Sequence, residues 1–267
     1  MAGASGAVDA APRLNWLALL GFAATLVLLS AGLAPTLESR RLQTACARQA
    51  RDIIYRLLQE PAQTEELDKT LAQIAPACAE VTASQALLSN VYFQAGNQAW
   101  QAQQWAAAAA AYRTSIARDP GQAMPRRRLA EILLYRDQQP AAALAQLQQA
   151  QVLAPHESYT YMVMAHAYAA LNDPEHGLQA AEQALAVAKT PYGYMVQGQM
   201  LAALARWPEA IASLRASLVL DDQAAVTYLL LGNALQANGE TDAAREAWAE
   251  AQRRDPSIQD AGVHSPP

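Results

Sequence analysis

The hydrophobic and polar positions of this chain recur with a regular period from Ser89 onward. Small residues fall at equivalent places in successive periods, at spacings of 35, 34, 33 and 34 residues: Ala108, Ala143, Gly177, Ala210 and Ala244. Each lies in the same frame of a helical segment, a short turn, a second helical segment and a break, which is often Asp-Pro or Ala-Pro. A fixed period of roughly 20–50 residues is the signature of a repeat architecture. The pattern predicts stacked helical hairpins over residues 89–122, 124–157, 158–190, 191–224 and 225–258.

Composition supports the helical interpretation. Hydrophobic residues make up 52% of the 267 residues, but only two are Phe, so the apolar content is mostly Ala and Leu. These are the strongest apolar helix formers, and few segments show the β-branched alternation of strands. The chain is therefore predicted to be all-α.

The frame resembles the tetratricopeptide repeat (TPR), a helix-turn-helix of about 34 residues. An aromatic residue at position 4 and a small residue at position 8 carry the resemblance in four of the five periods: Tyr92 and Gly96, Tyr161 and Ala165, Tyr194 and Gly198, Tyr228 and Gly232. The second period departs from it, with Arg127 and Glu131 at these positions. Small residues let the two helices of a hairpin approach closely, and neighbouring hairpins must stack to bury their apolar faces. The resemblance implies five TPR repeats over residues 82–258, wound into a right-handed superhelical solenoid.

TPR solenoids present a concave groove lined by the first helix of each repeat, and the resemblance implies a groove here. Its residues would be Phe93, Asn97, Trp100, Arg128, Ile132, Tyr135, Tyr159, Met162, His166, Tyr192, Met195, Gln199, Leu229 and Asn233. Aromatic anchors and adaptable methionines suit an extended peptide or an amphipathic helix of a partner protein. The alternative is that Phe93, Trp100, Tyr135 and Met162 pack mainly within the superhelix. A clamp for a chaperone's terminal carboxylate is disfavoured, because Phe93 stands where such clamps have Lys.

An uncharged apolar segment, residues 14–34, precedes the repeats. As a helix these residues would span about 31 Å, which matches a bilayer core. A membrane anchor is favoured over a cleaved signal peptide, because the apolar run is long and Pro35 follows the best cleavage site. A disordered tail is expected before it, over residues 1–13, and a flexible tail after the repeats, over residues 259–267.

Residues 37–80 are predicted to form a helical hairpin that caps the solenoid. Cys46 and Cys78 each lie 16 residues from Ala62, near its turn. This equal spacing would place them side by side, so a disulfide is possible, which would imply an oxidising compartment; two free buried thiols are the alternative. The disulfide favours an extracytoplasmic repeat domain, whereas the arginines that follow the apolar segment favour a cytoplasmic one.

No catalytic constellation stands out in the sequence. His156, His166 and His176 recur every ten residues, which does not align ligands on a helix. The net charge of −5 and the shortness of the basic run at Arg126–Arg128 argue against nucleic acid as a partner. We therefore expect no enzyme activity, metal, cofactor or small-molecule substrate.

Two function classes remain at this point. The first is a membrane-tethered scaffold or chaperone-like adaptor that binds a partner segment in its groove. The second is a constitutive accessory or assembly subunit of a larger membrane complex. An accessory subunit would expose a large apolar patch that a transient binder would not need.

Overall fold

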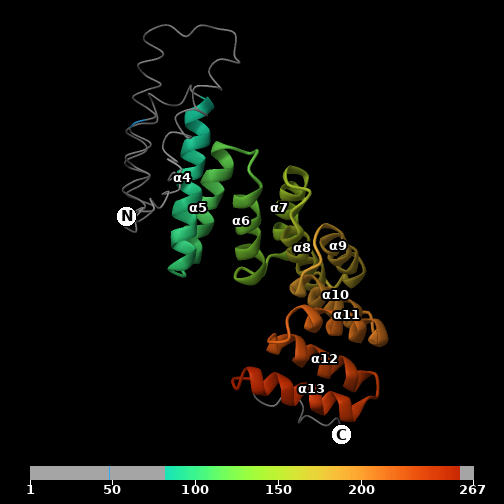
Figure 1. The fold of residues 1–267 in the computed structure, drawn as a ribbon. Helices are drawn as coiled ribbons and strands as arrows, with labels where there is room; N and C mark the ends of the chain where they lie inside the picture. The colour runs from blue at the N-terminus through green and yellow to red at the C-terminus, as the bar shows by residue number, and fades with distance from the viewer. Residues whose placement is uncertain (1–47, 49–81, 259–267) are drawn as a thin grey trace, which may run out of the picture.

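The computed structural model describes residues 82–258 and Arg48 (Figure 1). The predicted anchor at 14–34, the hairpin at 37–80 with Cys46 and Cys78, and the two tails lie outside these residues. Within the part described, no helix has both the length and the apolar character needed to cross a bilayer.

Residues 82–258 form ten helices and no strands, so the all-α prediction is confirmed for this part of the chain. The helices follow one another as five hairpins: α4 (Thr82–Gln101) with α5 (Trp105–Arg118), α6 (Ala123–Tyr135) with α7 (Pro140–Leu153), α8 (Ser158–Ala170) with α9 (Pro174–Val187), α10 (Pro191–Ala203) with α11 (Trp207–Leu220), and α12 (Ala225–Ala237) with α13 (Thr241–Arg254). The two helices of a hairpin pack most extensively with each other, and each second helix packs against the next hairpin. The helix axes turn progressively from α4 to α13, which gives the stack its superhelical form (Figure 1).

Each hairpin reverses direction through the same backbone geometry. One residue in each turn adopts a left-handed conformation with φ between 52° and 87°: Gln103, Gln138, Asn172, Ala205 and Gly239. In the turn at Ala205, the Arg206 N–H donates to the Leu201 carbonyl at 2.9 Å. A left-handed residue followed by this bond is a common way to end a helix. The shared turn geometry lets the same hairpin recur down the chain.

Glycine at position 8 lets a large side chain of the second helix approach the first helix. A Cβ on Gly96 would lie 2.5 Å from the Tyr112 ring, and one on Gly232 would lie 2.4 Å from the Trp248 ring. These close approaches bring the Tyr112 hydroxyl within 2.9 Å of Asn97 Oδ1. The periodic small residues thus act as the sequence predicts, by admitting the layer that fills each hairpin.

The last helix covers the C-terminal end of the stack with its own polar face. On α13, Arg245 pairs with Asp242 at 2.8 Å, and Arg253 and Arg254 both pair with Glu250. None of the exposed large hydrophobic side chains of the described residues lies on α13. Repeat five therefore ends the solenoid without a further capping helix within residues 82–258.

Candidate binding site on the concave face

The first helices of the hairpins line the inner face of the curve. Contacts join α6 to α8, α8 to α10 and α10 to α12, whereas the second helices are in contact mainly with first helices. A stack whose first helices lie closer together than its second helices curves toward the first helices. The concave face is therefore built from α4, α6, α8, α10 and α12.

The second repeat places two charged residues where the other repeats have an aromatic and a small residue. Arg127 and Glu131 are only 7% and 4% exposed. The Arg127 guanidinium donates to Glu157 Oε1 at 2.6 Å and lies 3.8 Å from Glu131 Oε1. Arg128 donates to the other Glu131 oxygen at 3.1 Å. Buried charges need such partners, because an unpaired charge is costly to remove from water.

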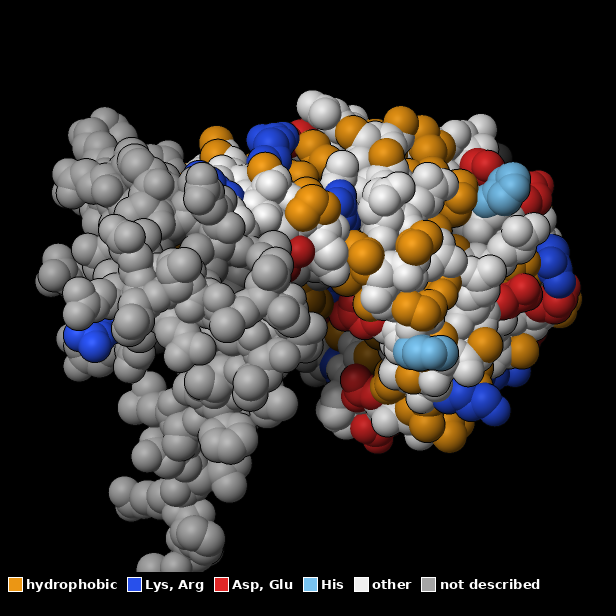
Figure 2. Space-filling model, turned by 90° about the horizontal axis from the view of Figure 1, so that it is seen from above, with side chains coloured by type: hydrophobic (Ala, Val, Ile, Leu, Met, Phe, Trp, Pro, Cys, Tyr) orange, Lys and Arg blue, Asp and Glu red, His pale blue; other side chains and the backbone are white. Residues whose placement is uncertain are grey.

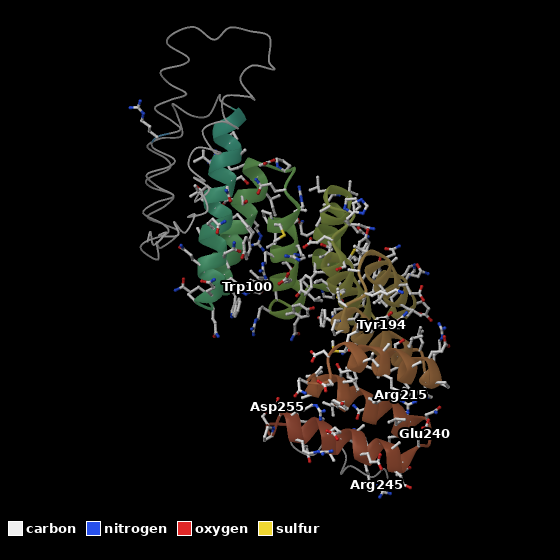
Figure 3. All side chains as sticks on the ribbon, viewed as in Figure 1. Trp100, Tyr194, Arg215, Glu240, Arg245 and Asp255 are labelled. Carbon is white, nitrogen blue, oxygen red and sulfur yellow. The ribbon has the colours of Figure 1, made fainter. Side chains whose placement is uncertain are left out.

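Aromatic side chains extend this ion-pair group to the neighbouring repeats. The Arg128 guanidinium lies 5.2 Å from the Trp100 ring of α4, and that of Arg127 lies 4.8 Å from the Tyr159 ring of α8. Cation–π attraction favours both placements. Trp100 extends from the C-terminal end of α4 (Figure 3).

A set of aromatic contacts joins α8 to α10. Tyr159 stacks on Tyr192 with centroids 6.0 Å apart, and the Tyr192 hydroxyl is hydrogen-bonded to His166 Nε2 at 3.0 Å. Tyr135 meets the His166 ring edge to face at 6.2 Å. We refer to the connected set as the concave cluster: Trp100, Arg127, Arg128, Glu131, Tyr135, Glu157, Tyr159, His166 and Tyr192.

Burial shifts the protonation equilibria of the cluster. Loss of hydration raises the pKa of Glu131, against the opposing effect of Arg128 and Arg127. Loss of hydration also lowers the pKa of His166 and raises that of Tyr192 to about 12. At neutral pH the imidazole is therefore uncharged and the tyrosine keeps its proton. The cluster can offer hydroxyl and guanidinium donors beside aromatic faces.

Six of the fourteen predicted groove residues meet in the cluster, namely Trp100, Arg128, Tyr135, Tyr159, His166 and Tyr192. Tyr135 is the most open large side chain of the cluster, at 49% exposed. Phe93, Met195, Gln199 and Leu229 are half-buried on the same first helices, away from the ion pairs. These positions are open enough for a partner to reach.

Two predicted groove residues lie in the core instead. Ile132 is 1% exposed and Met162 is 3% exposed, and both belong to the main hydrophobic cluster. The curvature of the stack presses α6 against α8 at these levels, so the side chains fill the space between repeats rather than line a groove.

Asn97 and Asn233 help to hold their own hairpins together. Their Oδ1 atoms accept hydrogen bonds from the Tyr112 hydroxyl and from Trp248 Nε1, at 2.9 and 3.0 Å. Each asparagine thus bridges its first helix to the second helix through its carbonyl oxygen, and its NH₂ group is a second polar group that can donate to a ligand.

The sequence interpretation did not assign Arg127, Glu131 and Glu157 to the site. A signal for the first two was present, because they are the departures from the aromatic and small residues of the other repeats. Glu157 gave no such signal, since only the stacking of the third repeat on the second brings it to Arg127.

The concave face offers binding contacts rather than a reaction centre. Among the residues the structure describes, no three His, Cys, Asp or Glu side chains gather as metal ligands would. The polar groups of the cluster are engaged with one another and with aromatic rings. The arrangement suits recognition by hydrogen bonding and aromatic packing.

Comparisons with known proteins agree on the repeat type. A family model described as "Tetratricopeptide repeat" matches residues 93–158 and 229–261. These matches support a tetratricopeptide-repeat protein. Among curated proteins, no significant match to the sequence was found.

Solved structures of TPR proteins share the fold. One is a thermophilic TPR protein of Thermus thermophilus, with a TM-score of 0.56 and 22% identity over 65% of this chain and 94% of that one. Another is MamA from Desulfovibrio magneticus RS-1, with a TM-score of 0.56 and 12% identity over 64% and 97%. A third is YrrB, described as a TPR protein with an unusual peptide-binding site, with a TM-score of 0.52 and 16% identity over 64% and 88%.

At these identities the likeness establishes the TPR solenoid fold and leaves the ligand open. TPR proteins are typically interaction scaffolds without enzyme activity, which places the concave face of this TPR protein among protein-binding surfaces.

Proposed function

We propose that this TPR protein is a scaffold that binds a segment of a partner protein on its concave face. The concave cluster is the observation that carries the proposal. It gathers Trp100, Arg128, Tyr135 and two further tyrosines from four consecutive repeats, and aromatic residues and arginine dominate the energetics of protein interfaces. Half-exposed Tyr135 would be a first point of contact for the partner.

A membrane tether through residues 14–34 is part of this proposal. The length and uncharged character of that segment support it. Alkaline extraction of membranes from cells that express the full-length chain would check the tether. The chain is expected to stay with the membrane pellet, and its release into the wash would contradict an anchor.

A second candidate function, a constitutive accessory subunit, is favoured by one edge of the solenoid. Seven of the nine exposed large hydrophobic side chains lie where second helices end or first helices begin: Met124, Val152, Leu153, Val187, Val219, Leu220 and Val226. We refer to this set as the apolar edge. On the face seen in Figure 2, hydrophobic side chains are likewise exposed among polar ones. A permanent neighbouring subunit would cover such an edge.

One pair of variants separates the two functions once a partner has been captured by photo-crosslinking. We expect Tyr135→Ser to weaken binding of the purified partner about tenfold, because it removes an aromatic contact from the groove. Val219→Ser on the apolar edge is its matched control, since Val219 is 85% exposed and its replacement should not disturb folding. Isothermal titration calorimetry gives both affinities. If Val219→Ser weakens binding and Tyr135→Ser does not, the partner covers the edge and the accessory-subunit function holds.

A further inference from the structure

The concave face is almost free of charged residues outside the second repeat. Helices α4, α8, α10 and α12 contain no Asp, Glu, Lys or Arg, although these residues make up 16% of the chain. The charges of the first helices are confined to α6, which carries Arg126, Arg127, Arg128 and Glu131.

The charges of α6 are satisfied within the fold. Arg127 and Arg128 pair with Glu131 and Glu157, as described above. Arg126 instead hydrogen-bonds Gln146 of α7 and the Pro120 carbonyl. A charged side chain of a ligand would therefore lose its hydration along the groove without gaining a free counter-charge, and that is costly.

Side-chain amides replace charges along the groove. Asn97, Gln199 and Asn233 occupy the same position in α4, α10 and α12. The Oε1 atom of Gln199 is buried and has no hydrogen-bond partner among the described residues. Asn97 and Asn233 use their Oδ1 atoms within the hairpin and carry NH₂ donors. The three amides together provide both an acceptor and donors.

Donors and acceptors of this kind match an extended main chain. An extended segment has an N–H and a carbonyl to satisfy at every residue, whereas a helix pairs most of its own. Apolar groups beside the amides, Met195 on α10 and Leu229 on α12, can pack against aliphatic or aromatic side chains of the same segment.

We propose, on the basis of the scaffold function above, that the concave face takes an extended partner segment that has no charged side chains. The amides of Asn97, Gln199 and Asn233 hold the main chain of this segment. Its aromatic and aliphatic side chains pack along α10 and α12.

The test uses the full-length chain and three sets of short fluorescent peptides with the same apolar residues. Their polar positions carry only Gln and Ser, only Glu, or only Lys. Fluorescence anisotropy at low and high ionic strength gives the affinities. We expect the neutral set to bind about tenfold more tightly than either charged set, with little dependence on salt. Tighter, salt-sensitive binding of an acidic or basic set would overturn the inference while leaving the scaffold function in place. If no set binds, the scaffold function itself fails.

A double variant tests the amides without disturbing the hairpins. Asn97→Asp with Asn233→Asp keeps the Oδ1 acceptors for Tyr112 and Trp248 but removes both NH₂ donors and adds charge to the groove. Neutral peptides are expected to bind at least several-fold more weakly to this variant. The control, Gln149→Glu with Gln179→Glu, adds the same charge at exposed sites on α7 and α9 and should bind as wild type does. Equal affinity of the two variants for neutral peptides, with unchanged circular dichroism, would exclude the proposed role of the amides.

Discussion

Replacing Arg127 by tyrosine is expected to lower the free energy of unfolding by about 3 kcal/mol at neutral pH. The substitution installs the residue type that four other repeats carry at this position, so shape alone would not predict a large loss. The loss arises because Glu131, 4% exposed, keeps only Arg128 as a partner once Arg127 is gone. Removing one member of a buried ion pair is far more costly than removing the whole pair. Urea unfolding monitored by circular dichroism measures the effect.

The matched control is the double variant Arg127→Tyr with Glu131→Ala. It gives the second repeat the same pair that the third repeat has in Tyr161 and Ala165. The charges left behind, Arg128 and Glu157, have about a third of their side chains exposed to water and can be hydrated. We expect the double variant to lie within about 1 kcal/mol of the wild type. A double variant as unstable as the sum of its two single variants would show that the ion pair contributes net stability.

The pH dependence of the single variant gives an independent check. Burial raises the pKa of Glu131 in the folded state above its unfolded value, and Arg127 opposes this effect. Without Arg127 the pKa rises further, so the folded state takes up a proton that the unfolded chain does not yet bind. Stability from this group is then gained as the pH falls through the folded pKa. The deficit of Arg127→Tyr relative to wild type should therefore shrink from neutral to mildly acidic pH. His166 titrates in the opposite sense, but it is present in both proteins and largely cancels in the comparison.

Gly232→Ala is expected to destabilise the fifth hairpin by about 2 kcal/mol. The new Cβ would lie 2.4 Å from the Trp248 ring, whose indole is held in place by its hydrogen bond to Asn233. Either α12 and α13 separate or the ring turns and loses that bond. Because repeats are stabilised mainly by their nearest neighbours, the loss should be confined to the C-terminal end. Hydrogen exchange should accelerate in α12 and α13 and remain unchanged in α6 and α7.

Gly121→Ala serves as the control for backbone effects. Gly121 lies in the turn between α5 and α6, where a Cβ would meet only the Asp119 carboxylate at 3.2 Å. We expect its stability to change by no more than about 0.5 kcal/mol. If both glycine variants behaved alike, close packing beneath Trp248 would not be the reason for the glycine at 232.

The repeat architecture could be predicted from the sequence because it depends on residues close together in the chain. The spacing of small residues, the aromatic at position 4 and the breaks between helices each act within one hairpin. Gly96 beneath Tyr112 and Gly232 beneath Trp248 show this directly, since both partners belong to the same repeat. The helices accordingly follow the predicted order over residues 82–258.

The accessible part of the groove could be predicted only in outline. Ile132 and Met162 occupy repeat positions that the TPR resemblance assigns to the groove, yet neighbouring repeats cover them. Arg127 and Glu131 looked like defects in the repeat pattern, and became intelligible only when Glu157 was found beside Arg127. The burial of each groove position depends on the side chains that the next repeat brings to it.

The helical hairpins of residues 82–258, their number and the helices that line the groove could all be derived from sequence, because they follow from local periodicity and from the need of each hairpin to stack. The folded stack was needed to learn which groove side chains remain open, how the charges of α6 are paired, and that the exposed hydrophobic residues gather along one edge. Those properties arise from contacts between residues of different repeats, which are far apart in the chain and brought together by the curvature of the stack.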